Sequence, residues 1–173
     1  MYATPDVEAR LASLEVRLTE LEDREAIRNL IASYGPLADG GDATATAALW
    51  DPEGVYAVGG FGDNVGRAAV AALIEAPTHR GMMAMGCAHV LSPVQVELSR
   101  HTAIAIGYSC VFLRRDAVFE VFRVSSNRWE LRKSDGQWRV QRRTNRLLDG
   151  DEAARALLRR EAQDGEYPTG RAR

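Results

Sequence analysis

Residues Met85–Pro93 read MGCAHVLSP and open a long β-forming region. Four strand-like runs follow one another, and the short polar turns between them are typical of antiparallel hairpins. The runs span about 87–98, 102–114, 118–133 and 138–148. Strands of this length need a strongly twisted or bent sheet, and we expect the bends or bulges at Ser92–Pro93 and Ser125–Asn127.

The chain before this region is mainly helical. A helical pattern runs from about Asp6 to Leu37 and stops at Gly40–Gly41, and shorter helices are expected over 43–50 and 67–75, the latter closed by Pro77. Val55–Val58 is expected to form a short strand before the glycine-rich stretch 59–66. Such a stretch can bind a nucleotide phosphate, but a nucleotide site would require a second βα unit, and none follows. We therefore interpret the stretch as a sharp turn. Helices followed by strands, without βαβ alternation, predict an α+β fold.

The helix before Gly40 carries two apolar patterns. The first is Val7, Leu11, Leu14, Leu18 and Leu21, spaced by alternating steps of four and three as in a coiled-coil seam. The second, from Ile27 to Tyr34, is a broader face suited to a globular core. We therefore expect an N-terminal helical arm (1–22), a main domain (23–150) and a charged terminal helix (151–162) with a mobile tail. The arm either mediates self-association or folds back on its own domain.

Length and charge restrict the class of protein. The chain has 173 residues, enough for one domain, and 22 Lys and Arg against 24 Asp and Glu give a formal net charge of −2. We therefore expect no nucleic-acid partner and no anionic membrane surface as partner. No apolar run is long enough to cross a bilayer and no signal peptide is visible, so a cytoplasmic protein is expected. The two cysteines, Cys87 and Cys110, lack metal-ligand spacing and are interpreted as reduced core thiols.

His89 is the candidate catalytic base. An imidazole in apolar surroundings needs a hydrogen-bond partner, and histidine titrates close enough to neutral pH to act as an acid or a base. Asp39 also stands out, because a carboxylate at a helix C-terminus is disfavoured by the helix dipole, which indicates a task other than stability. The competing interpretations are a core histidine bonded to a backbone carbonyl and an ordinary turn aspartate. If the strand is unbroken, His89 lies on the other face of the sheet from Val96. A bulge at Ser92–Pro93 would change this alternation and turn His89 inward.

The order of these motifs resembles a known family. The helix 24–34 reads REAIRNLIASY, and DGGD follows at 39–42. The segment 129–140, which joins the last two predicted strands, reads WELRKSDGQWRV. With His89 placed between them, this resembles the SnoaL-like group of the nuclear-transport-factor-2-like superfamily, nearest the branch of scytalone dehydratase, lindane dehydrochlorinase and bile-acid 7-alpha-dehydratase. The resemblance covers about 14–150. It implies a cone-shaped barrel of strongly curved, mainly antiparallel sheet with helices on its concave face and an apolar pocket, in a homodimer or homotrimer.

The resemblance also implies site residues. Asp39 and His89 would form the family's acid–base dyad, and Tyr34 would fall at the position of the helix residue that assists it. The arginine of the last strand would be Arg143, although Arg142 shares parity with Trp138. No second pocket histidine, such as scytalone dehydratase has, can be assigned. Further residues suited to an apolar pocket wall, although each taken singly is more often an ordinary core residue, are Trp50, Tyr56, Met83, Met85, Tyr108 and Phe122.

These residue types suit proton transfer at carbon. A histidine oriented by a carboxylate could remove a proton next to a carbonyl, while Tyr34 assists the departing or developing oxygen. The expected activity is a lyase (dehydratase) or isomerase that needs no cofactor and acts on a hydrophobic ring-bearing molecule. The alternatives are a non-catalytic binding module and a partner subunit like the small subunits of ring-hydroxylating dioxygenases.

Overall fold

The computed structural model describes residues 7–59 and 62–159. The helices are α1 (Val7–Asp39), α2 (Ala43–Ala48), α3 (Gly66–Glu75), α4 (Pro77–Met85) and α5 (Glu152–Ala156). The strands are β1 (Trp50–Val58), β2 (Gly62–Val65), β3 (Cys87–Leu91), β4 (Gln95–Ser99), β5 (Thr102–Arg115), β6 (Val118–Ser134) and β7 (Gln137–Leu147). No helix within these described residues is long and apolar enough to span a bilayer.

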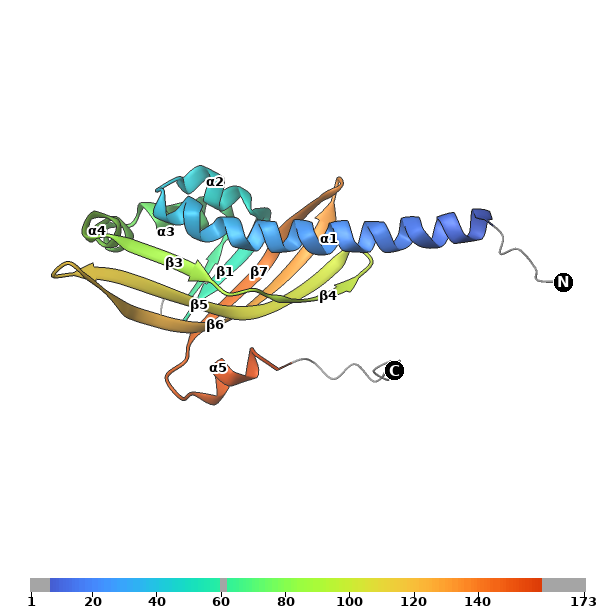
Figure 1. Ribbon diagram of the computed structural model, residues 1–173. Coiled ribbons are helices and arrows are strands. Elements are labelled where there is room, and N and C mark those ends of the chain that lie inside the picture. The colour runs from blue at the N-terminus through green and yellow to red at the C-terminus, as the bar shows by residue number, and fades with distance from the viewer. Residues whose placement is uncertain (1–6, 60–61, 160–173) are drawn as a thin grey trace.

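The strands form one curved sheet in the order β2-β1-β7-β6-β5-β3, and β4 also pairs with β5 (Figure 1). All neighbours are antiparallel except β1 and β7, which are parallel. The predicted α+β class and mainly antiparallel sheet are therefore confirmed. The sheet curves but does not close, since β2 and β3 lie at its two ends without pairing to each other.

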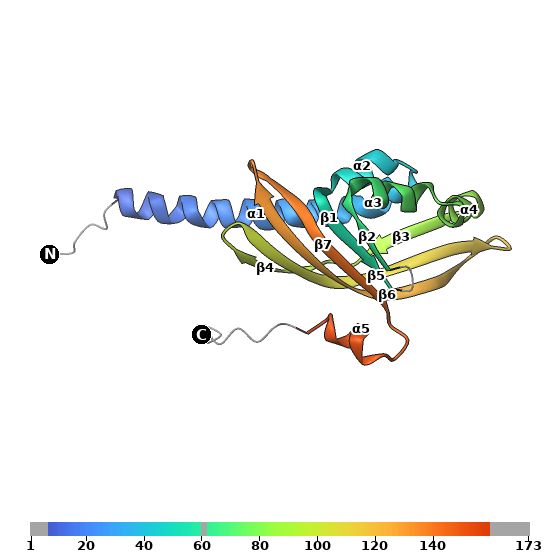
Figure 2. The same ribbon diagram turned by 180° about the vertical axis from the view of Figure 1, so that it is seen from behind.

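Four helices cover one face of the sheet. Figures 1 and 2 show α1 to α4 on the face toward which the sheet curves, and α5 on the opposite face. Ile27 and Ile31 of α1 are fully buried there against Trp50 and Trp129 from the sheet. Burying several such side chains stabilises the helix layer by about 2 kcal/mol each. This layer fixes the C-terminal half of α1 over the strands.

The end of α1 is set by a tight turn. The helix continues through Pro36 to Asp39, two residues further than expected, and Gly41 adopts a left-handed φ of 72° that most residues avoid. Asp42 then caps α2, with its Oδ1 accepting a hydrogen bond of 2.9 Å from the backbone N of Ala45. The chain therefore reverses immediately after Asp39.

Several predicted boundaries are corrected. Pro77 does not simply end a helix but occupies the first turn of α4, a position where its missing N–H has no consequence. The predicted strand over 87–98 is two strands, interrupted at 92–94. Of the bend or bulge predicted at Ser125–Asn127, the bulge does not occur, because the register shifts instead leave Phe122 of β6 and Gln141 of β7 as the extra residues.

The chain ends also differ in part from expectation. The terminal helix covers only Glu152–Ala156 of the predicted 151–162, and the predicted mobile tail lies outside the described residues, as do residues 1–6 of the arm. The described part of the arm continues α1 as a straight helix that leaves the main body (Figure 1). Its apolar side chains are exposed, so the arm does not fold back onto its own sheet through them.

Candidate active site

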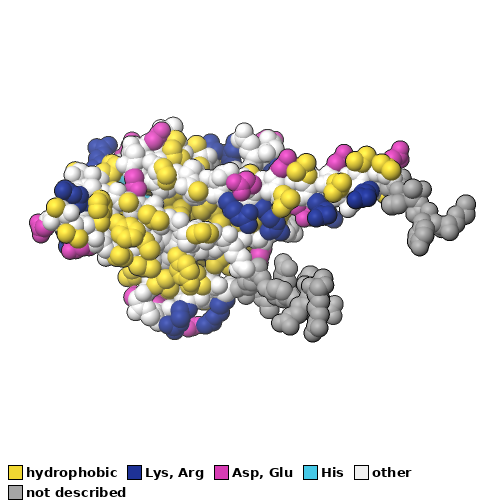
Figure 3. Space-filling model, viewed as in Figure 1, with side chains coloured by type: hydrophobic (Ala, Val, Ile, Leu, Met, Phe, Trp, Pro, Cys, Tyr) yellow, Lys and Arg dark blue, Asp and Glu magenta, His cyan; other side chains and the backbone are white. Residues whose placement is uncertain are grey.

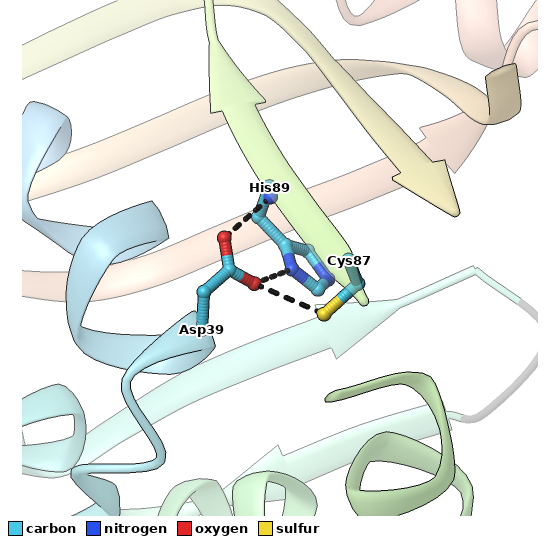
Figure 4. Close-up of side chains that lie close together, drawn as sticks. All are labelled: Asp39, Cys87 and His89. Atoms are coloured by element: carbon cyan, nitrogen blue, oxygen red, sulfur yellow. Dashed lines mark hydrogen bonds and ion pairs between the residues drawn. The ribbon is translucent and has the colours of Figure 1, made fainter. Parts of the chain in front are cut away.

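Asp39 and His89 meet where α1 ends beside β3. Asp39 Oδ1 accepts a hydrogen bond of 2.5 Å from Nδ1 of His89, and Oδ2 accepts one of 2.7 Å from the backbone N of the same residue (Figure 4). The helix and strand can approach this closely because residue 35 is glycine: a β-carbon there would overlap the carbonyl oxygen of His89. Both ends of the carboxylate are thus fixed by one residue.

The pKa of Asp39 reflects this contact. Burial alone would raise it, but hydrogen bonds from the ring and backbone of His89 and from the Cys87 thiol, 3.4 Å away, lower the pKa below its ordinary value. Asp39 is therefore a carboxylate at neutral pH. A carboxylate can only accept, so Nδ1 of His89 must carry the proton.

The other ring nitrogen of His89 faces the interior of the protein. The side chain is 13% exposed and lines a cavity, and no residue in the described part of the chain hydrogen-bonds to Nε2. His89 points inward together with Val96, while Val90 is exposed, because the interruption at 92–94 changes the phase of the strand. A neutral His89 therefore presents a free Nε2 lone pair to the cavity.

The cavity has a volume of about 460 Å³ and lies between the helix layer and the sheet. Its apolar wall comes from α3, α4 and the three strands β1, β3 and β5: Val58, Leu73, Ile74, Met82, Leu91, Val111 and Leu113. Of the predicted pocket residues, the lining includes Tyr34, Tyr56, Met85, Phe122 and Arg143. This size and composition are typical of a site for a small hydrophobic ligand.

Three predicted wall residues lie elsewhere. Trp50 is fully buried behind the tyrosines, with its ring centroid 6.0 Å from that of Tyr34. The Met83 side chain lies beside Gly41. Tyr108 is 49% exposed, because its side chain points to the opposite face of β5 from that of its neighbour Ser109, which lines the cavity. Sequence alone does not distinguish core or surface aromatic residues from pocket residues.

Arg143, rather than Arg142, reaches the cavity. The extra residue Gln141 shifts the phase of β7, so that Arg143 is buried while Arg142 forms a surface ion pair of 2.9 Å with Asp63. The alternation of faces counted along β7 from Trp138 would place Arg142 toward the cavity, but the bulge interrupts this alternation. Parity along a strand holds only where the register is continuous.

The guanidinium of Arg143 has no partner of opposite charge among the described residues. Its carbon lies 4.1 Å from the ring centroid of Tyr34 and 4.2 Å from that of Trp129. Nε and Nη2 both donate to Oδ1 of Asn127, at 3.0 and 2.9 Å, whereas Nη1 is buried and donates to no described residue. A buried cation with a free donor is suited to bind an oxygen that is negative or becomes so.

Tyr34 is a neutral hydroxyl beside this cation. It is 5% exposed, and its oxygen lies 3.4 Å from the hydroxyl oxygen of Tyr56. Burial, reinforced by Tyr56 and only partly opposed by Arg143, raises the pKa of Tyr34 far above its ordinary range. Tyr34 therefore stays a neutral hydroxyl at neutral pH, and such a hydroxyl can donate a hydrogen bond.

His79 is a cavity residue that sequence reasoning missed. It lies on α4, and its ring centroid is 5.4 Å from that of His89. Its Nδ1 lies 3.0 Å from the carbonyl oxygen of Ile74, which can only accept, so Nδ1 carries the proton. Burial lowers the pKa of His79, and its Nε2 is buried with no partner in the described structure. The only signal in the sequence was its place two residues after a proline that begins a helix.

Asp39, Cys87 and His89 could also be considered as metal ligands, since their donor atoms lie within 4.8 Å of one another. Burial, together with the adjacent Asp39 carboxylate, raises the pKa of Cys87 to about 11. Cys87 is therefore a neutral thiol at neutral pH, and Nδ1 of His89 carries a proton toward Asp39. A metal ion would have to displace both protons, so this donor set fits a hydrogen-bonded dyad better than a metal site.

The fold is shared with solved structures. An NTF2-like protein with a cystatin-like fold from Novosphingobium aromaticivorans is 54% identical, with a TM-score of 0.85 over 86% of this chain and 97% of that one. A variant of Rv3472, a protein of unknown function from Mycobacterium tuberculosis, is 21% identical, with a TM-score of 0.67 over 83% and 87%. A candidate scytalone dehydratase from N. aromaticivorans is 20% identical, with a TM-score of 0.62 over 75% and 86%.

Comparison with curated proteins gave no match. The family model of the SnoaL-like domain matches residues 19–144, which include Tyr34, Asp39, His79, His89 and Arg143. This match covers most of the chain, and it agrees with the resemblance inferred from the motifs. The chain belongs to the SnoaL-like domain family of the NTF2-like superfamily.

Proposed function

We propose that this protein is a cofactor-independent lyase of the dehydratase type, or an isomerase, acting on a hydrophobic ring-bearing small molecule. One observation carries the proposal: Asp39 holds Nδ1 of His89, and Nε2 of the same ring opens into an apolar cavity. A base held in one tautomer and screened from bulk water is what proton abstraction from carbon needs.

In the proposed reaction, His89 Nε2 removes a proton from the carbon next to a carbonyl group. The C–H bond electrons form the C=C bond of an enolate, and Asp39 stabilises the imidazolium that results. The negative charge develops on the carbonyl oxygen, where Nη1 of Arg143 and the hydroxyl of Tyr34 are suited to donate hydrogen bonds.

The enolate then has two outcomes. In dehydration, it expels the β-hydroxyl group, the C–O bond breaks, and the proton held by His89 leaves with that oxygen as water. In isomerisation, the substrate is a β,γ-unsaturated ketone: its enolate is conjugated with the existing C=C bond, His89 returns the proton to the γ-carbon, and the double bond shifts to the α,β position. Neither step consumes an oxidant or a reductant. Nε2 of His79 is suited to accept a hydrogen bond from a substrate hydroxyl, since it is a buried acceptor with no partner among the described residues.

The comparisons support this proposal only in its outline. The SnoaL-like match establishes the family, and the likeness to a candidate scytalone dehydratase at 20% identity establishes the fold alone. The choice of an acid–base enzyme rests on the cavity side chains. Their arrangement as one base, one buried cation and one neutral donor is more specific than the fold.

The proposal is tested with a panel of bicyclic β-hydroxy ketones. We expect the wild-type protein to form the conjugated enone, measured by its ultraviolet absorbance. His89→Ala should lower turnover by a factor of about 100 or more and leave ligand affinity within a few-fold, since general base catalysis contributes about 10²–10⁴. His101→Ala is the matched control, because His101 is exposed at the turn before β5.

Two outcomes would contradict the proposal. Tight binding of the panel without turnover by the wild-type protein would indicate a binding module. Co-purification with a second polypeptide that is required for any turnover would indicate a partner subunit.

A further inference from the structure

The described part of the arm, residues 7–22 of α1, displays a stripe of large apolar side chains (Figure 3). The stripe consists of Val7 (67% exposed), Leu11 (54%), Leu14 (48%), Leu18 (56%) and Leu21 (64%). Five such side chains in a row are more than the scattered apolar residues of an ordinary surface. Contiguous exposed apolar side chains of this kind mark surfaces for binding another molecule.

The stripe points away from the protein's own sheet. At 3.6 residues per turn, the five residues lie about half a turn around α1 from Ile27, Ile31 and Tyr34, which are packed in the core. The groove between the arm and β4 is lined by Ala12, Val16 and Thr19, which also belong to the body-facing side. Within residues 7–59 and 62–159, the main body therefore does not cover the stripe.

The spacing of the stripe is that of a coiled-coil seam. Steps of four and three place Leu11 and Leu18 at heptad position a, and Val7, Leu14 and Leu21 at position d. The next a and d positions are Glu25 and Arg28, both exposed and charged. The seam thus ends at Leu21, close to where α1 begins to pack on the sheet.

The charges beside the seam select its partner. Arg10 and Arg17 occupy position g on one side, and Glu15 and Glu22 occupy position e on the other. Two parallel copies in register bring Arg10 of one helix next to Glu15 of the other, and Arg17 next to Glu22, twice each by symmetry. An antiparallel pair would instead oppose arginine to arginine and glutamate to glutamate.

We propose that the arm pairs in parallel with the same arm of a second copy of this chain. The charge pattern is complementary to itself only in that orientation, and the seam of each helix faces away from its own body. The two main domains then lie at the same end of the pair, on opposite outer sides. This inference is independent of the proposed enzymatic function, because no residue of the arm lines the active-site cavity.

The orientation is tested by cross-linking the full-length chain. In the parallel pair Leu21 lies beside Leu21 of the second copy, so Leu21→Cys should form a disulfide-linked dimer on mild oxidation, seen on a non-reducing gel. The wild-type chain, with Cys87 and Cys110, is the control and should stay uncross-linked. A disulfide only in a mixture of Val7→Cys and Leu21→Cys chains would indicate an antiparallel pair and overturn the proposal.

The seam is tested by sedimentation equilibrium. Leu14→Asp should raise the dissociation constant of self-association by about 100-fold or more, because a leucine is lost from each copy. Val16→Asp introduces the same charge outside the seam, on a side chain that is also exposed (61%), and should change it only a few-fold. Both substitutions replace exposed residues, so the fold should persist. Equal association of Leu14→Asp and wild type would overturn the proposal, as would a monomeric wild type.

A charge swap tests the pairing itself. Arg17→Glu should weaken association by about 5- to 30-fold, because it sets glutamate against Glu22 twice, and adding Glu22→Arg should restore it. An antiparallel seam would show no such rescue. A double variant as weak as the single variant would therefore contradict the parallel arrangement.

Discussion

Replacing Asp39 by Asn is expected to reverse the tautomer of His89. The Asn oxygen can still accept from the backbone N of His89, now 2.7 Å from Asp39 Oδ2. The amide NH2 would then lie where Oδ1 now accepts from Nδ1 at 2.5 Å. Because that group donates, Nδ1 must accept and the proton moves to Nε2. The nitrogen that faces the cavity would lose its lone pair.

The size of the effect follows from the same contacts. Two hydrogen bonds to a carboxylate contribute about 1.5–3 kcal/mol each, and Asn replaces them by two neutral ones of about 1 kcal/mol each. With the Asp39 side chain 22% exposed, we expect the free energy of unfolding to fall by about 2 kcal/mol at pH 7. Any turnover should fall by about 10²–10⁴, the usual contribution of a correctly oriented base.

This loss should depend on pH in a defined direction. The folded-state pKa of Asp39 is lowered from 3.8, so its contribution is complete above pH 3.8 and disappears as the pH falls through the lower folded value. Urea unfolding should therefore give wild-type and Asp39→Asn curves that differ at pH 5 and above and converge in strong acid. Their difference removes the contribution of groups that do not contact Asp39.

Nitrogen-15 NMR of the imidazole rings measures the tautomer directly. The chain has three histidines, and a His89→Gln variant identifies the signals of His89. We expect the Nδ1–H form in wild type and the Nε2–H form in Asp39→Asn. An unchanged tautomer, with unfolding free energy within about 0.5 kcal/mol of wild type, would refute the claim that Asp39 orients the ring.

Three further variants test other parts of the site. Gly35→Ala should destabilise the fold by about 3 kcal/mol or more in urea unfolding, since its β-carbon would overlap the carbonyl oxygen of His89; an unaffected variant would contradict the tight packing of α1 on β3. The free energy of unfolding of the wild type should decrease as the pH falls below 6.5, because the folded-state pKa of His79 is lowered and the unfolded chain binds the proton first. His79→Gln should make this decrease smaller. An equal pH dependence of the unfolding free energy in both proteins would contradict a buried neutral His79. Arg143→Met should abolish enone formation yet change the free energy of unfolding by less than about 1.5 kcal/mol, because a desolvated cation is replaced by an apolar chain and Asn127 still accepts from Asn145; a loss of about 4 kcal/mol would indicate a structural role.

The elements with strong local patterns could be predicted from the sequence. The long helix up to Asp39 and the strands β5, β6 and β7 were placed within a few residues, because helical periodicity and turn residues determine them locally. Helix α4 was missed, since Pro77 is compatible with either the end of one helix or the start of the next. Because this helix was not predicted, His79 was not assigned to the site.

Side-chain direction was harder to predict than element type. His89 and Arg143 both lie next to an irregularity in their strand, and each irregularity reverses the face on which the following residues lie. Bulges are set by pairing across the sheet, which local sequence does not encode. The juxtaposition of Asp39 and His89, 50 residues apart, followed only from the family resemblance, because contacts of that range leave no local pattern.

The most direct test of the acid–base account is hydrogen–deuterium exchange at the α-carbon of a bound bicyclic ketone, followed by proton NMR in D2O. Exchange requires only the proposed base and a stabilised enolate, and no leaving group. The account predicts exchange catalysed by the wild-type protein and slowed by about 100-fold or more in His89→Gln, with ligand affinity retained. A bound ketone whose α-protons do not exchange, or which exchange equally fast in His89→Gln, would contradict it.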